Sequence, residues 1–411
     1  MKHVLRLTLA WAALAICARD ASAQSTEKWH WMADGVLFAT FNQQESPRGE
    51  TEFRSQNWIM GSGLRKLGPG QLFVNGMLSF EPMTVTARGY SQLFQMGEAY
   101  NQLENIDRQH PHDFFSQLAA GWKLPLGSHS AVTFFGAPVG EATLGPVAFM
   151  HRRSASENPT APLGHHTFDS THVAQGVAGM SIDAGPFTLE GSAFHGREPD
   201  QYRYGVTPGK LDSWATRLWF RKGEWNAQAS YGYLHQPEEL EPGNIKRTTG
   251  SISWSRERLD HAMSVTAMYG HNERTYTDLP AFLVEGLGRI KRTAFYTRVE
   301  LLDVETEHLL FPSIVHKPHP GELVDRLNAY TVGGVQEIYS PKWFSLGLGA
   351  DVTFYNVPNR LRPFYNRGYA GPDTPGGSPY GVHVFARIRP GGGPFMRMWN
   401  MTMSAPMRHS M

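Results

Sequence analysis

Histidine and carboxylate side chains recur in two short segments of this chain, and these residue types bind transition-metal ions. The first segment is 109–113, with the sequence QHPHD, and the second is 165–172, with the sequence HHTFDSTH. Neutral imidazole and carboxylate together form sites for zinc, copper and similar ions. Hydrogen-bonded networks that anchor loops use the same residues, so both interpretations stay open. The candidate metal ligands are His110, His112, Asp113, His165, His166, Asp169 and His172.

Methionines gather at the other end of the chain, in a tail that spans 391–411. Thioether sulfur is a soft ligand that favours Cu(I), so the tail predicts a second binding place for copper or another transition metal. A low-complexity tail without a ligand is the alternative. We expect the tail to follow the last strand, 380–389, and to hang in the periplasm. Its candidate ligands are Met396, Met398, Met401, Met403 and His409.

Two serine–histidine pairs could act as a nucleophile and its base. They are Ser170 with His172, and Ser116 with His112. Neither pair has a recognisable orienting group or oxyanion motif in the sequence. We therefore expect a protein that is not an enzyme, with a barrel-embedded lipid hydrolase as the alternative.

The first residues have the pattern of a secretory signal peptide. Lys2 and Arg6 precede an apolar run from Leu7 to Ala18, and small residues lead to a cleavage site between Ala23 and Gln24. The segment 1–23 would contain the only cysteine, which excludes disulfides in the mature chain. A formal net charge of +1 offers no basic field for nucleic acid.

Strands, rather than helices, must position these groups. In 224–235, apolar residues alternate with polar ones, and the same period of two recurs at 344–354 and 382–389. No run of 18 apolar residues follows the signal, so no membrane-spanning helix is expected. The pattern predicts an all-β protein over 24–390, an up-and-down antiparallel transmembrane β-barrel of about 16 strands, with 14 to 18 as the range. A soluble β-sandwich or propeller is the alternative.

Short and long connections alternate along the chain, as in barrels of the bacterial outer membrane, where short turns are periplasmic and long loops external. This topology requires an outward strand at 306–315, between strands at 290–303 and 327–340. It also brings the histidine segments, and the segment HGREPD at 195–200, to the external end. The partners of such a barrel are outer-membrane lipid and the barrel assembly machinery. The long connections are 84–112, 139–170, 197–210, 236–246, 272–289 and 357–379.

Several ordered strings resemble a family of uncharacterised bacterial outer-membrane barrels. They are DRQHPHD at 107–113, LGHH at 163–166 with DSTH at 169–172, GREPD at 196–200 and LDS at 211–213. The resemblance implies a porin-like barrel, and members of this family often occur beside copper or other heavy-metal resistance systems. It assigns no catalytic role to any residue.

Together these observations predict an outer-membrane barrel with a porin-like transport or envelope role, linked to copper or another transition metal. The alternatives are the lipid hydrolase and a plugged structural or ligand-binding barrel. Charged residues on the inward face, such as Arg217, Arg298 and Asp351, fit either a wet channel or a salt-bridged plug.

Overall fold

Alternation along a single strand shows why this sequence forms a barrel with a polar interior. In β14 (Trp225–Leu234), Asn226 and Gln228 are buried, whereas Trp225 and Tyr231 are exposed. Successive side chains of a strand point to opposite faces, so the polar residues of β14 face inward and its aromatic residues face outward. Polar inside and apolar outside is the reverse of the arrangement in a water-soluble sandwich.

The structure is a computed structural model that describes residues 28–207, 209–258, 260–311, 319–391, 398–399 and 401–404. The predicted signal peptide, 1–23, lies outside these residues. Within them, each helix is too short or too polar to span a bilayer.

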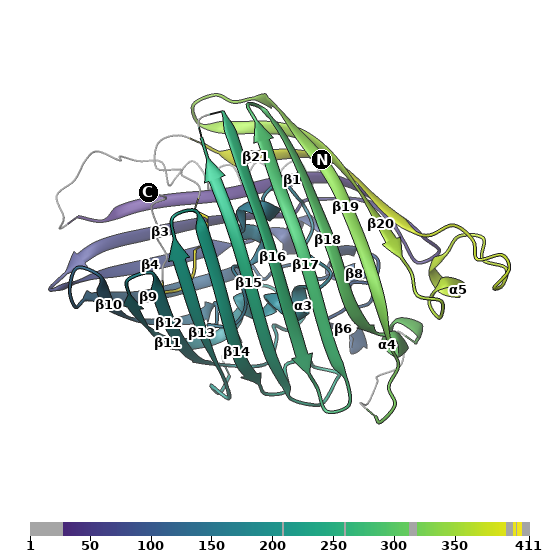
Figure 1. The fold of residues 1–411 in the computed structure, drawn as a ribbon, viewed down its shortest axis with the longest axis horizontal. Helices are drawn as coiled ribbons and strands as arrows, with labels where there is room; N and C mark the ends of the chain where they lie inside the picture. Colours follow the sequence, from purple (N-terminus) through teal and green to yellow (C-terminus); the bar gives the residue numbers. More distant parts are fainter. Residues whose placement is uncertain are drawn as a thin grey trace.

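One antiparallel sheet closes on itself, because β1 pairs with β21 on one side and with β2 and β3 on the other. β2 and β3 pair with successive parts of β1 and act as one interrupted strand, which gives a closed barrel of 16 strands. The predicted fold is confirmed (Figure 1). The strands of the barrel are β1 (His30–Glu45), β2 (Thr51–Arg54), β3 (Asn57–Leu67), β4 (Gly70–Leu78), β9 (Phe115–Pro125), β10 (Ser130–Gly140), β11 (Ala174–Ala184), β12 (Phe187–Phe194), β13 (Ser213–Lys222), β14, β15 (Ile245–Glu257), β16 (His261–Glu273), β17 (Asp278–Ile290), β18 (Thr293–Glu305), β19 (Val324–Tyr339), β20 (Phe344–Asn356) and β21 (Tyr380–Pro390).

Short and long connections alternate as expected, with two corrections in the second half of the chain. The predicted long connection at 272–289 is wrong, because β17 occupies most of it and only 274–277 joins β16 to β17. The predicted strand at 306–315 is also wrong, because α4 (Thr306–Leu310) is a helix and 312–318 lie outside the described residues. In β17, Leu283 faces inward and Phe282 outward, so apolar residues on both faces hide the alternation.

The long connections carry further short elements, all at one end of the barrel or inside it. We call this end the long-loop mouth and the opposite end the short-turn end. These elements are α2 (Glu81–Thr84), β5 (Tyr90–Ser91), β6 (Ala99–Tyr100), β7 (Leu103–Glu104), β8 (Arg108–Gln109), the 3-10 turns η1 (Phe149–His151), η2 (Arg153–Ala155) and η3 (Ser170–His172), α3 (His165–Phe168) and α5 (Arg362–Tyr365).

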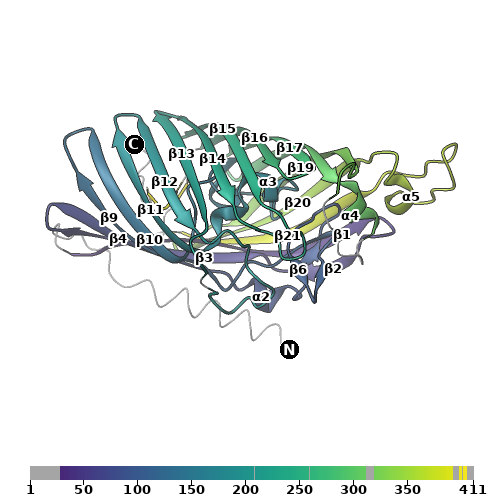
Figure 2. The same ribbon diagram turned by 90° about the horizontal axis from the view of Figure 1, so that it is seen from below.

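Connection 141–173 folds into the lumen and fills it. Helix α3 packs on the inner faces of β16 and β17, and Figure 2 shows it within the barrel. Arg152 joins Asp169, at 2.7 Å, to Glu285 of β17, at 2.8 Å. Glu157 reaches Arg389, one residue before the end of β21, with an Oε1–Nη1 distance of 2.6 Å. Inward charges of the strands therefore form salt bridges with this plug.

Candidate metal-binding site

Five imidazole rings converge at the long-loop mouth, and we call this group the histidine pocket. Two come from the connection that follows β8, two from α3 and one from η3. The rings of His165 and His172 lie 5.1 Å apart, those of His112 and His172 5.5 Å, and those of His110 and His166 5.6 Å, between centroids. The predicted gathering of both histidine segments at one mouth is therefore confirmed. The members of the pocket are His110, His112, His165, His166 and His172.

Every ring in the histidine pocket faces an oxygen acceptor with its Nδ1 atom. Three of these hydrogen-bond acceptors are carboxylates and two are backbone carbonyls. Because an acceptor oxygen requires a hydrogen on Nδ1, a neutral ring held in this way carries its lone pair on Nε2. Metal-binding histidines are oriented by the same kind of contact in known metal sites. The Nδ1 contacts are His110 to the Pro111 carbonyl at 3.3 Å, His112 to Glu81 at 3.0 Å, His165 to Asp169 at 2.6 Å, His166 to Glu198 at 3.2 Å, and His172 to the Asp169 carbonyl at 2.7 Å; His110 Nδ1 also lies 3.2 Å from Glu98.

Two of the Nε2 atoms face each other directly. The Nε2 atoms of His112 and His172 are 3.4 Å apart. If both rings are neutral, two lone pairs meet across this gap, so a proton or a cation must lie between them. The Nε2 atoms of His110 and His166 are also buried, and neither has a hydrogen-bond partner among the described residues.

Gly97 keeps a space open beside His166. Its φ of +124° is unfavourable for residues with a side chain, and a Cβ built there would lie 2.2 Å from His166 Nε2. The other atoms nearest to that position also belong to the His166 ring. A glycine is thus required both by the backbone conformation and by the ring that it faces.

The surroundings give two rings of the pocket opposite charge preferences. Burial lowers the pKa of His166, but the carboxylate of Glu198 outweighs burial and raises that pKa to about 9. Burial, with the charges of His165 and His112, lowers the pKa of His172 to about 3. His172 is therefore neutral at physiological pH, the state in which an imidazole binds a metal ion.

The two predicted aspartate ligands contact cations in this structure. Asp113 accepts hydrogen bonds from Arg203 and from the Gln175 side-chain amide. Asp169 accepts from Arg152 and from the backbone N–H of Phe149, in addition to its contact with His165. Both carboxylates thus orient neighbouring groups in this structure.

Glutamates supply most of the carboxylates at the histidine pocket, and sequence reasoning did not name them as ligands. Ligand atoms of His166, Glu198 and Glu238 lie within 4.8 Å of one another. Glu198 belongs to the segment 195–200, which the predicted topology places at the same end of the barrel as the histidines. That placement could have identified Glu198 as a neighbour of the pocket. Glu238 lies in the connection between β14 and β15, which has no motif of its own.

The described part of the methionine-rich tail lies inside the barrel, so the expectation of a tail hanging in the periplasm is wrong for these residues. The backbone N–H of Met398 donates to Asp34 of β1, and Met403 Sδ accepts from Gln117 of β9 at 2.9 Å. Polar inward groups of the strands thus hold the tail. Met396 and His409 lie outside the described residues.

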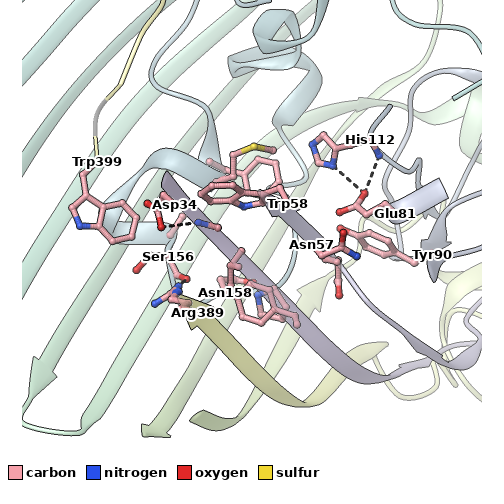
Figure 3. Close-up of a pocket in the computed structure, with 18 residues that line it drawn as sticks. Asp34, Asn57, Trp58, Glu81, Tyr90, His112, Ser156, Asn158, Arg389 and Trp399 are labelled. Atoms are coloured by element: carbon pink, nitrogen blue, oxygen red, sulfur yellow. Dashed lines mark hydrogen bonds and ion pairs between the residues drawn. The ribbon is translucent and has the colours of Figure 1, made fainter. Parts of the chain in front are cut away.

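Inward-facing methionines from the barrel and the plug meet the tail. Met398 and Met401 pack with Met60 of β3, Met77 of β4 and Met150 of η1, and we call these five the methionine cluster. A cavity of about 40 Å³ adjoins both His112 and Met150, so it lies between the histidine pocket and this cluster. Figure 3 shows it, with His112 beside Glu81 at one side and Arg389 and Trp399 at the other.

No protein-family model matches this chain, and no curated protein matches it. Among solved structures, OmpF of Salmonella typhi aligns with a TM-score of 0.51 at 6% identity, over 87% of this chain and 97% of that one. The chain has the fold of an outer-membrane β-barrel. OmpT of Vibrio cholerae gives 0.48 at 8% identity, over 90% and 100% of the two chains. An anion-selective porin from Comamonas acidovorans gives 0.47 at 12%, over 88% and 100%.

The serine–histidine pairs of this barrel are engaged elsewhere. Ser116 donates to the backbone carbonyl of Asp113, and Ser170 accepts from Arg247. His172 directs its Nδ1 to a carbonyl and its Nε2 to His112. These contacts leave both pairs without the hydrogen bond from nucleophile to base that covalent catalysis requires.

Proposed function

We propose that this protein resides in the bacterial outer membrane and binds a divalent transition-metal ion, of the zinc or copper type, in the histidine pocket. The single observation that carries the proposal is the 3.4 Å approach of the Nε2 atoms of His112 and His172, each on a ring whose Nδ1 faces an oxygen acceptor. Two nitrogens bound to a tetrahedral ion at about 2.0–2.1 Å lie about 3.3–3.4 Å apart. The gap therefore has the dimension that one shared ion needs.

The neighbouring groups support a metal ion over a shared proton. Burial also lowers the pKa of His110, whose buried Nε2 has no hydrogen-bond partner among the described residues, so a further neutral ring nitrogen in the pocket is open to an ion. Imidazole nitrogen suits zinc and copper better than calcium or magnesium, which prefer oxygen ligands. The ring of His165 also packs against that of His172, at 5.1 Å between centroids, with its Nδ1 held by Asp169.

The outward face of the barrel supports its place in a membrane. Large apolar side chains in mid-strand are exposed on it, such as Leu218 of β13 at 45% and Phe282 of β17 at 40%. Water would oppose a continuous face of this kind, whereas lipid accommodates it. Outer-membrane barrels carry their long loops on the external side. The long-loop mouth would therefore be external, and the histidine pocket would face the surroundings of the cell.

The filled lumen indicates capture of the ion at the surface, with passage inward only when the plug moves.

Zinc titration of the refolded protein by calorimetry tests the binding. We expect the double variant His112→Gln/His172→Gln to lose one zinc equivalent, or to bind that equivalent roughly 100-fold more weakly, because it loses the facing nitrogens. His195→Gln is the matched control, since His195 contacts the Lys210 carbonyl outside the pocket. Equal affinity in the double variant and the control would refute the proposal.

The methionine cluster is a candidate for a second, softer site. Its five methionines pack together in the lumen, and Met150 lines the cavity that also adjoins His112. Thioether sulfur favours monovalent Cu(I) and Ag(I). Silver binding by wild type and by Met398→Leu/Met401→Leu tests this assignment, because leucine preserves the apolar packing and removes the sulfur. Unchanged silver affinity would leave the cluster as apolar packing alone.

A further inference from the structure

A second cavity at the long-loop mouth has a strongly acidic lining. Its volume is about 30 Å³, enough for a single water or ion. Three connections contribute to it: 79–114, 235–244 and 306–323. The other lining residues are apolar or glycine, and no lysine or arginine is among them. The ionisable residues that line it are Glu98, Glu104, Glu238, Glu239, Glu241 and His308.

One ring nitrogen at this cavity faces two carboxylates at once. His308 Nδ1 lies 3.0 Å from Glu104 Oε2 and 3.0 Å from Glu241 Oε1. A ring nitrogen carries at most one hydrogen, so it cannot make a good hydrogen bond to both oxygens. Ligand atoms of these three residues lie within 4.8 Å of one another. The two carboxylate oxygens and the ring nitrogen are therefore close enough to one another to bind the same ion.

Glu104 is the least satisfied member of this group. Its side chain is 10% exposed, and both of its oxygens are buried without a hydrogen bond of acceptable geometry. The contact with His308 brings the charges together but does not satisfy the carboxylate. A buried carboxylate in this state is costly unless a cation accompanies it.

The surrounding charges are also out of balance. Arg274 contacts Glu238, Glu241 and Glu305, and the other ring nitrogen of His308 lies 3.5 Å from Glu322. Among the described residues, Glu104 brings the carboxylates around Arg274 and His308 to five, and His166 adds one more cation beside Glu238, so carboxylates outnumber cations here. Like charges at this separation in a buried region repel strongly. A divalent cation would relieve most of the excess.

We propose that a divalent cation binds Glu104, Glu241 and His308 and holds the three connections together over the long-loop mouth. Two carboxylate oxygens and one imidazole nitrogen form a ligand set for Zn²⁺ or Mn²⁺, in contrast to the all-imidazole histidine pocket. The site shares no residue with that pocket. The inference therefore stands independently of the proposed function.

Thermal unfolding in the presence of Zn²⁺ tests the site, in a His112→Gln/His172→Gln background that removes zinc binding to the facing histidines. An ion that binds only the folded state raises the melting temperature with concentration. We expect this rise in the background protein, its loss in Glu104→Gln/Glu241→Gln, and its retention in Glu239→Gln, which alters a residue that lines the cavity but lies outside the ligand group of Glu104, Glu241 and His308. A rise that survives Glu104→Gln/Glu241→Gln would overturn the proposal.

Two further measurements cover the remaining outcomes. Loss of the zinc effect in Glu305→Gln/Glu322→Gln, with retention in Glu104→Gln/Glu241→Gln, would move the ion to the other ring nitrogen and contradict this assignment. If the Glu104 variant does not fold, Mn²⁺ paramagnetic resonance on the background protein decides. We expect one bound Mn²⁺ with hyperfine coupling to a single imidazole nitrogen, and no bound Mn²⁺ would refute the proposal.

Discussion

Glu157 holds the far end of the plug, and its replacement by glutamine tests whether charge keeps the lumen closed. Glu157 is buried and makes ion pairs with Arg387 and Arg389 of β21. Glutamine has nearly the same size and can still accept one hydrogen bond. Its neutral side chain removes the negative charge that faces the buried guanidinium groups of Arg387 and Arg389. Arg387 keeps a 3.3 Å contact with Glu337.

The pKa of Glu157 sets the size of the effect. Glu157 belongs to the plug and to none of the strands that cross the membrane. Burial raises its pKa, but the guanidinium groups of Arg389 and Arg387 outweigh burial and lower it from 4.5 to about 2. That difference corresponds to about 3 kcal/mol of folding stability at neutral pH. Removal of one partner from a buried ion pair gives a similar figure, about 3–5 kcal/mol.

Because the folded pKa is below the unfolded one, this stability is present above pH 4.5 and is lost as the pH falls through 2. We expect Glu157→Gln to lower the free energy of unfolding by about 3 kcal/mol at pH 7, measured by chemical denaturation in lipid vesicles. The deficit relative to wild type should shrink as the pH falls below 4.5.

Glu257→Gln is the matched control, because Glu257 pairs with Arg153 of the plug but is 53% exposed at the short-turn end. We expect it to change stability by less than about 1 kcal/mol. In planar bilayers, Glu157→Gln should conduct more often than wild type as the plug loosens. Equal stabilities of the two variants, or a deficit that does not shrink in acid, would refute the ionic account of the plug.

Three further changes test the pocket, the membrane face and the loop network. Gly97→Ala should displace the His166 ring and weaken zinc binding, whereas Gly127→Ala, where nothing lies within 4 Å, should not. Leu218→Lys, in the middle of β13, should cost about 2–4 kcal/mol of stability in lipid, while Tyr276→Lys, equally exposed but between strands, should cost less than about 1 kcal/mol. Arg203→Met leaves Glu98 and Asp113 buried without their cation and should cost about 3–5 kcal/mol in vesicle denaturation. An unchanged value in any of the three would contradict the role assigned to that residue.

The barrel could be predicted from the sequence because period-two alternation survives wherever the lumen is lined by polar side chains. β14 is such a strand, with Asn226 and Gln228 inward and Trp225 outward. The prediction failed at β17, where the plug packs on Leu283 and makes the inward face apolar as well. The predicted number of strands is nevertheless right, because the prediction missed β17 but included a strand at 306–315 that does not exist.

The candidate site was predicted in part for a similar reason. The up-and-down topology alone brings the segments that contain His110 and His172 to one mouth. Their contacts with Glu98 and Glu198 depend on how the long connections fold inward, and no local pattern encodes this. The methionines show the same limit, because Met60 and Met77 pair across β3 and β4, and no local pattern shows that Met398 and Met401 of the tail pack against them.

Anomalous scattering at the zinc edge, from crystals of the refolded protein grown with one equivalent of zinc, shows directly whether His112 and His172 share an ion. We expect a peak about 2.0–2.1 Å from the Nε2 atoms of both rings. The two rings would keep their Nδ1 contacts with Glu81 and the Asp169 carbonyl. A map without a zinc peak between these two rings, whether or not zinc is bound elsewhere, would contradict the proposed site.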